Sequence, residues 1–277
     1  MLIFVLILSS LFCLLAGPIE SEIVFADDQV VDVPILMYHS ILKSRKGQYI
    51  ISPDDLKNDL LWLKEHGYES VFVSDLINFC EGNGDLPEKP VVITFDDGHY
   101  NNYYYAKPIF EELQFRATIN IVGNYSEYST SSGDIDNPNY SHLTWEEIKA
   151  LQENEFFEIG NHTYNMHNLK PRYGIGKKAS EDYETYKKNL TEDVTRLEDC
   201  FKDKCGFTTN IFAYPFGKYS TESCEILSSL GFKAFLTCNE GINHLKKGDE
   251  SKLKTLKRYN RSGLMTTKEF FKHAGMS

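Results

Sequence analysis

The chain has 277 residues, 42% of them hydrophobic, and a formal net charge of −11 at pH 7. This length suits one α/β domain with a self-sufficient core, and the acidic balance argues against a nucleic-acid or acidic-lipid partner. The six cysteines are scattered and none forms a Cys-x-x-Cys pattern, which excludes a disulfide framework and a thiolate metal site. Whether Cys200 and Cys205 pair locally stays open.

An uncharged apolar stretch occupies residues 2–16. It is short for a membrane span and typical of the apolar part of a secretory signal, although no Lys or Arg precedes it. We therefore expect residues 1–26 to be a signal peptide or a short N-terminal membrane anchor. Residues 27–277 would form one domain that is secreted or associated with the cell envelope.

Short apolar runs then alternate with amphipathic stretches, which is the pattern of repeated βα units. About seven such units without a glycine-rich phosphate fingerprint predict an α/β protein with a barrel-like parallel sheet, not a dinucleotide-binding fold. The predicted strands cover residues 34–39, 69–73, 90–96, 116–122, 156–161, 210–215, 233–238 and 255–259.

Three helices have clear signals. Ser52-Pro53 begins one that Gly67 ends, and Thr144 with Glu147 forms a capping box that begins another. A third is expected over about 181–202, where apolar residues recur at helical spacing. Residues 124–141 read as a long polar loop, which we predict to form a substrate rim.

Residues 91–98 read Val-Val-Ile-Thr-Phe-Asp-Asp-Gly, a buried strand that ends in two carboxylates. Burying Asp96 and Asp97 is costly unless a cation or hydrogen bonds receive them. Side chains alternate along a strand, so the two aspartates should not point the same way. Gly98 allows a sharp turn at the carboxyl end of the strand, where α/β folds place their chemistry.

A complementary motif, His162-Thr163-Tyr164-Asn165-Met166-His167, follows another apolar run. Two neutral imidazoles and one carboxylate bind a borderline metal ion and leave coordination positions open for water and substrate. The spacing differs from His-Glu-x-x-His on a helix, which excludes the zincin arrangement.

Four ordered blocks of the sequence resemble the polysaccharide deacetylases, carbohydrate esterases with nodulation-type deacetylase homology. Residues 94–98 resemble the first motif of this family, and residues 162–167 resemble the second with one extra residue before the last histidine. Residues 34–40 and 212–217 resemble blocks of the branch that deacetylates exported poly-N-acetylglucosamine. The resemblance covers roughly residues 34–272 and implies a distorted, incomplete (β/α) barrel with about seven parallel strands.

The resemblance also implies roles for individual residues. Asp97, His162 and His167 would bind one divalent metal ion, with zinc the first choice and cobalt, nickel or iron as alternatives. Asp96 would be the general base on the attacking water. The backbone amide of Phe216 would bind the developing oxyanion.

Two expected groups depart from the commonest family pattern or have no clear counterpart in it. The usual arginine two residues before Pro215 is replaced by Ala213, so we expect Arg258 to orient Asp96 in its place. The late histidine motif that supplies the general acid is not evident. His39, at the end of a predicted strand, is the expected acid, and His244 is the alternative.

The sequence thus predicts a monomeric, exported bacterial enzyme that removes N-acetyl groups from poly-N-acetylglucosamine or peptidoglycan. An O-acetyl esterase acting on xylan or another acetylated glycan is the alternative enzyme, because the same site would cleave an ester. A catalytically silent carbohydrate-binding protein on the same fold is the alternative of a different class. An aspartyl-phosphate phosphohydrolase is disfavoured, because Gly98 stands where that class needs a second aspartate.

Overall fold

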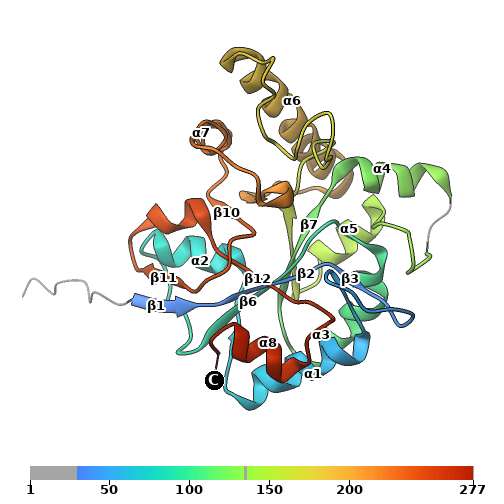
Figure 1. Ribbon diagram of the computed structural model, residues 1–277, viewed down its shortest axis with the longest axis vertical. Coiled ribbons are helices and arrows are strands. Elements are labelled where there is room, and N and C mark those ends of the chain that lie inside the picture. Colours follow the sequence, from blue (N-terminus) through green and yellow to red (C-terminus); the bar gives the residue numbers. More distant parts are fainter. Residues whose placement is uncertain (1–29, 134–135, 277) are drawn as a thin grey trace, which may run out of the picture.

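The computed structural model describes residues 30–133 and 136–276, and a curled parallel sheet lies at its centre (Figure 1). Its strands run in the order β10-β9-β8-β7-β6-β2-β12, and every neighbouring pair is parallel. The predicted incomplete barrel is confirmed. The strands are β2 (Ile35–Tyr38), β6 (Pro90–Phe95), β7 (Ala117–Ile121), β8 (Phe157–Asn161), β9 (Ile211–Ala213), β10 (Ala234–Leu236) and β12 (Tyr259–Asn260).

Smaller strands complete the sheet and its rim. The predicted strand 69–73 is shorter than expected: β5 (Glu69–Ser70) pairs with the start of β6, and a helix begins at Val73. Outside the main sheet, β1 (Val30–Val33) forms an antiparallel ribbon with β11 (Asn243–Lys246). A two-stranded pair, β3 (Ser40–Ile41) with β4 (Ile50–Ile51), stands beside the carboxyl end of β2.

Near its end the chain crosses from β10, at one edge of the sheet, to β2, where β12 becomes the other edge strand. Leu256 N donates to Phe235 O at 2.9 Å beside β10, and β12 then pairs with β2. The predicted strand at 255–259 was therefore largely wrong. A 3₁₀ helix, η4 (Glu250–Thr255), precedes the crossing. Regular pairing begins only at Tyr259, because the segment bonds first to β10 and then to β2.

Helices cover the outside of the sheet, and the three predicted ones are confirmed. Helix α1 (Pro53–Glu65) and helix α5 (Trp145–Gln152) begin with the capping boxes of Ser52 and Thr144, and α6 (Tyr183–Cys200) continues into a π-helical turn. The remaining helices are α2 (Val73–Cys80), α3 (Lys107–Leu113), α4 (Gly123–Ser132), α7 (Thr221–Ser229) and α8 (Thr267–His273), with a π-helical turn η1 (Asn102–Ala106) and a 3₁₀ turn η3 (Pro215–Gly217).

Helix α4 corrects the prediction of a polar loop over residues 124–141. Its sequence is rich in Ser and Tyr and carries no apolar stripe, so periodicity could not reveal it. Tertiary contacts hold its first turn instead, because Gly123 N and Asn124 N donate to the carbonyls of Thr163 and Tyr164 at 3.0 and 2.8 Å. Among the described residues of the predicted loop, only Asn139 and Tyr140, near its end, line the cavity described below.

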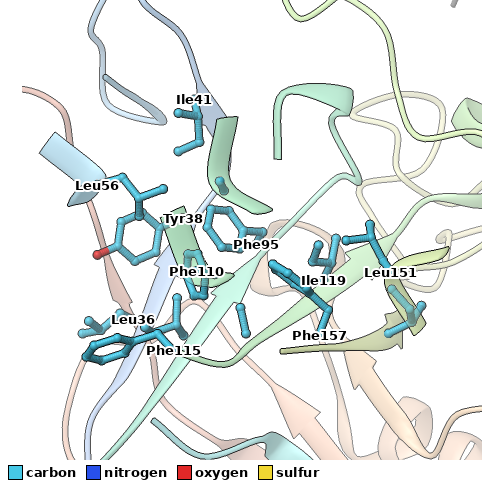
Figure 2. Close-up of a cluster of buried hydrophobic side chains, with 14 of the residues drawn as sticks. Leu36, Tyr38, Ile41, Leu56, Phe95, Phe110, Phe115, Ile119, Leu151 and Phe157 are labelled. Carbon is cyan, nitrogen blue, oxygen red and sulfur yellow. The ribbon is translucent and has the colours of Figure 1, made fainter. Parts of the chain in front are cut away.

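The main core lies between the outer face of the sheet and the helices around it (Figure 2). Val91, Ile93 and Phe95 alternate along β6 and belong to this core, whereas Val92 belongs to a second cluster with β2, β9 and β10. The alternation therefore directs Thr94 and Asp96 to the inside of the barrel.

No helix within residues 30–133 and 136–276 is both long enough and apolar enough to cross a membrane. The predicted signal or anchor over residues 1–26 lies outside the described residues.

Candidate active site

A cavity of about 570 Å³ opens at the carboxyl ends of the parallel strands. Residues that follow different strands line it: His39 after β2, Asp97 after β6, His162 after β8, and Phe216 in the turn after β9. The position agrees with the general rule for parallel α/β sheets, whose loops at the carboxyl edge carry the chemistry.

The turn after β6 separates the two aspartates. Asp97 has a φ of 73°, an uncommon conformation for a residue with a side chain, and Gly98 follows with a φ of 62°. A Cβ on Gly98 would lie 2.9 Å from Ile121 Cδ1, which is the movable end of a side chain, so the positive φ is the main reason for glycine here. As a result, Asp96 stays inside the barrel and Asp97 turns into the cavity.

The structure brings Asp97, His162 and His167 together. One ligand atom from each lies within 4.8 Å of the others, and Asp97 Oδ1 is 3.8 Å from His162 Nε2 and 3.2 Å from His167 Nε2. Asp97 Oδ1 is also buried and has no hydrogen-bond partner. A buried carboxylate oxygen aimed at two imidazole nitrogens fits a divalent cation well.

The hydrogen bond on the far side of His162 sets its tautomer. Its Nδ1 lies 2.7 Å from Ala213 O, and because a carbonyl only accepts, Nδ1 carries the proton. Nε2 therefore keeps its lone pair toward Asp97, as a metal ligand requires. Burial lowers the pKa of His162 to about 4, which keeps the ring neutral at ordinary pH. Ala213, the departure from the family pattern, thus supports this imidazole through its backbone.

Asp96 forms a fully buried pair with Arg258. Two parallel bonds join the guanidinium to the two carboxylate oxygens, both at 2.8 Å, and Arg258 Nε donates to Thr237 O at 2.8 Å. Asn120 Nδ2 donates to Asp96 Oδ1 at 2.7 Å. Burial alone would raise the pKa of Asp96, but the charge and bonds of Arg258 hold it far below its usual range.

The pKa of Asp97 also lies well below its usual range. Burial opposes this shift, and His99, His39 and His167 produce it by stabilising the charged form. Both aspartates are therefore ionised at working pH, although different groups stabilise them.

Of the two residues considered for the general acid, only His39 lies at the cavity. Its ring contacts Tyr49 at a centroid distance of 4.8 Å, its Nδ1 is buried without a partner, and burial lowers its pKa. His244 lies on β11, where its exposed ring bonds Asp32 at 2.5 Å, and it is not among the residues that line the cavity.

Aromatic side chains surround the mouth of the cavity. Phe216 has a φ of 57°, and its ring lies 4.4 Å from that of His167 and 5.2 Å from that of Tyr173. Tyr49, Tyr140 and Tyr173 are each at least half exposed and also line the cavity. Flat, partly exposed rings suit the apolar faces of sugar units.

Sequence reasoning assigned no role to His99 and His142 and overlooked Asn120. His99 Nε2 lies 3.6 Å from Asp97 Oδ2, and its ring stacks on that of His142 at 4.9 Å. Asn120 carried a usable signal, because it is a lone amide inside the apolar run of β7. A buried amide within a strand needs a partner, and here that partner is Asp96.

A larger hollow of about 810 Å³ lies away from this edge and includes Glu158 and Glu198. Both carboxylates already have backbone partners: Glu158 accepts from Val73 N and Glu198 from Thr209 N. This hollow therefore presents fewer unpartnered polar atoms to a ligand than the cavity at the strand ends does. Of the cysteines in the described residues, all are free, so Cys200 and Cys205 are not paired.

Comparisons with known proteins agree with this geometry. A family model described as polysaccharide deacetylase matches residues 83–235. The poly-beta-1,6-N-acetyl-D-glucosamine N-deacetylase of Escherichia coli (strain K12) is 26% identical over 241 residues, covering 77% of this chain and 35% of that enzyme. The chain thus spans about a third of the length of this relative.

Two solved structures share the fold. The deacetylase PplD of Streptococcus pyogenes, solved with acetate, superposes with a TM-score of 0.70 at 22% identity and covers 88% of this chain and 98% of its own. IcaB from Ammonifex degensii superposes with a TM-score of 0.66 at 25% identity, covering 82% and 91% of the two chains.

Proposed function

The chain belongs to the polysaccharide deacetylase family, and from that premise we propose that it is a metal-dependent enzyme that removes N-acetyl groups from N-acetylglucosamine units of a bacterial cell-surface polysaccharide. The observation that carries the proposal is the convergence of Asp97, His162 and His167 beside the Arg258-paired Asp96. The name of the Escherichia coli relative supports poly-N-acetylglucosamine as the substrate, with peptidoglycan as the alternative.

Asp97, His162 and His167 would hold the ion, most consistently zinc, because two imidazoles and one carboxylate are typical of catalytic zinc sites. A divalent cation bound there would supply acidified water and would polarise the acetyl carbonyl. The remaining steps belong to side chains and backbone groups of the chain itself.

Asp96 would accept the proton of the attacking water. Oδ1 already accepts from Arg258 and Asn120, whereas Oδ2 accepts only from Arg258 among the bonds of the described residues, so Oδ2 is the better placed atom. Its low pKa keeps it ionised and lets it pass the proton on readily, because protonated Asp96 beside Arg258 is a strong acid.

His39 and Phe216 would complete the reaction. His39, which burial keeps neutral by lowering its pKa, would receive the proton that Asp96 takes from the water and pass it to the leaving amine, since its ring lies in the same cavity and its Nδ1 has no competing partner. The backbone N–H of Phe216 would stabilise the oxyanion, a contribution of about 3 kcal/mol in other acyl-transfer enzymes.

The test measures acetate release by the purified protein from poly-β-1,6-N-acetylglucosamine or its oligomers. We expect turnover that stops after chelation and returns with zinc, cobalt or nickel. Unchanged turnover after thorough metal removal would contradict metal dependence. Release of acetate from O-acetylated xylan but not from the amide substrate would favour the esterase, and glycan binding without any acetate release would favour the silent binding protein.

We further propose that the protein acts outside the cytoplasm as a monomer, with residues 1–26 as a signal or tether and residues 27–277 as the catalytic domain. The apolar stretch at residues 2–16 supports export.

A further inference from the structure

The loop that joins the two histidines of the second motif rests on helix α6. Asp193, on this helix, accepts two consecutive backbone N–H groups of the loop: Tyr164 N donates to Oδ1 and Asn165 N donates to Oδ2, both at 2.9 Å. One carboxylate therefore fixes the stretch of backbone midway between His162 and His167. Figure 1 shows α6 at the edge of the molecule.

The loop needs such support because its backbone is strained. Thr163 is β-branched and has a φ of 72°, a conformation that costs of the order of 1–3 kcal/mol and persists only where its surroundings impose it. Its N–H donates to Asn161 Oδ1 at 2.9 Å, and Asn161 is held in turn by Glu198 of α6 at 2.8 Å.

A second contact ties the same loop to the same helix. Arg196 donates to Tyr164 Oη at 2.9 Å, and its guanidinium carbon lies 3.7 Å from the centre of the Tyr164 ring. Helix α6 therefore contacts the loop through Asp193 and Arg196, and its Glu198 holds Asn161 at the end of β8, just before the loop. Of these three, only Asp193 bonds the backbone between the two histidines.

We propose that Asp193 is a positioning residue that sets the separation of the His162 and His167 imidazoles, and so the affinity of the site for its ion. The inference rests on the proposed metal-dependent function. Asp193 is not among the residues that line the cavity, so it would act on the ligands through the backbone and not through the substrate.

A carboxylate is the group that this position requires. Asp193 has two acceptor oxygens for two donors, and although burial raises its pKa to about 6, it is ionised at neutral pH. The change Asp193→Asn preserves the size of the side chain but places an NH₂ group against one of the backbone N–H groups. That donor then loses its partner, and the loop is expected to shift.

The experiment measures zinc affinity by competition with a chromophoric chelator, for the wild type, Asp193→Asn and Glu192→Gln. Glu192 precedes Asp193 on the same helix, is exposed, and pairs only loosely with Lys188 at 3.8 Å, so it controls for the loss of one charge. We expect Asp193→Asn to bind zinc about 10- to 100-fold more weakly and Glu192→Gln to bind it as the wild type does.

A second readout separates positioning from simple stability. The melting temperature is measured with chelator and with zinc, and the zinc-induced rise should be smaller in Asp193→Asn than in the wild type. An unchanged rise with a lower metal-free melting temperature would overturn the inference, because Asp193 would then only stabilise the fold.

The two proposals fail in different ways. If the wild type binds no zinc, the proposed metal function fails and the inference falls with it. If the wild type binds zinc and Asp193→Asn binds it equally well, only the inference fails. Should Asp193→Asn not fold, Asp193→Ser retains one acceptor with less bulk, and the same two readouts apply with the same expected weakening.

Discussion

Asp96 and Asp97 are adjacent in the sequence but have opposite surroundings. Both carboxylate oxygens of Asp96 accept from Arg258, and Oδ1 also accepts from Asn120, whereas Asp97 Oδ1 is buried with no hydrogen-bond partner. A carboxylate already paired with a buried guanidinium is a poor metal ligand, and one with an unpartnered oxygen beside two imidazoles is a good one. The contacts therefore support different roles for the two residues.

This difference predicts different defects. Asp96→Asn should reduce turnover by about 10²-fold or more while zinc binding persists, because the proton acceptor is lost and the ligands remain. Asp97→Ala should lose both zinc and turnover. Metal content and acetate release, measured on the same preparations, check this, and identical defects in the two variants would contradict the division of roles.

Single residues differed in how far the sequence could place them. The convergence of Asp97, His162 and His167 could be predicted because these residues belong to two short motifs that follow strands. Arg258 could be proposed from the resemblance and the missing arginine, although its bidentate contact with Asp96 spans 162 positions. Asp193 could not be found, because it reads as one charged residue among many on an amphipathic helix. Only the folded structure shows that Asp193 accepts hydrogen bonds from the backbone of Tyr164 and Asn165.

Among the elements, those with local signals were predictable. Helices α1 and α5 carry capping boxes that act within four residues, and α6 has a long apolar stripe. Helix α4 and the crossing segment before β12 carry no such signal. Distant partners determine their conformations. Backbone carbonyls of Thr163 and Tyr164 hold the start of α4, and β10 and then β2 pair with the crossing segment and with β12.

The contact between the last segment and the β3–β4 pair gives a prediction at the scale of elements. A Cβ on Gly263 would lie 2.0 Å from Ile50 O, whereas the nearest atoms to a Cβ on Gly47 lie 4.0 Å away. Gly263→Ala must therefore push apart two backbones that help form the rim. We expect a loss of about 1–3 kcal/mol of unfolding free energy and a raised KM, with Gly47→Ala close to wild type.

Urea unfolding and the kinetics of acetate release measure these two effects. Equal stability of the two alanine variants would show that the segments separate without cost, and would contradict the close backbone contact.

At the scale of the whole molecule, buried histidines connect stability to pH. Burial lowers the pKa of His142 to about 4, against 6.5 when exposed. The unfolded chain then binds the proton more readily than the folded one at intermediate pH. The stability that neutral His142 contributes is present above about pH 6.5 and is lost as the pH falls toward about 4.

This linkage can be isolated with one substitution, because other buried groups titrate in both directions. His142→Phe keeps an aromatic ring against His99 and removes the titration. Between about pH 7 and about pH 5, metal-free His142→Phe should lose about 1–2 kcal/mol less unfolding free energy than the metal-free wild type. Urea denaturation at the two pH values measures this, and parallel losses would contradict the lowered pKa.

The crossing segment before β12 has one more consequence. Asp96 directly follows β6 in the first half of the chain, and its counter-ion arrives only when the segment that carries Arg258 docks beside β10 and β2. A folding intermediate that lacks this last docking step would hold Asp96 as an uncompensated buried charge, even if Asp97, His162 and His167 had already come together. Hydrolytic activity would therefore report that the whole chain has finished folding, and incompletely folded molecules would leave acetylated glycans untouched.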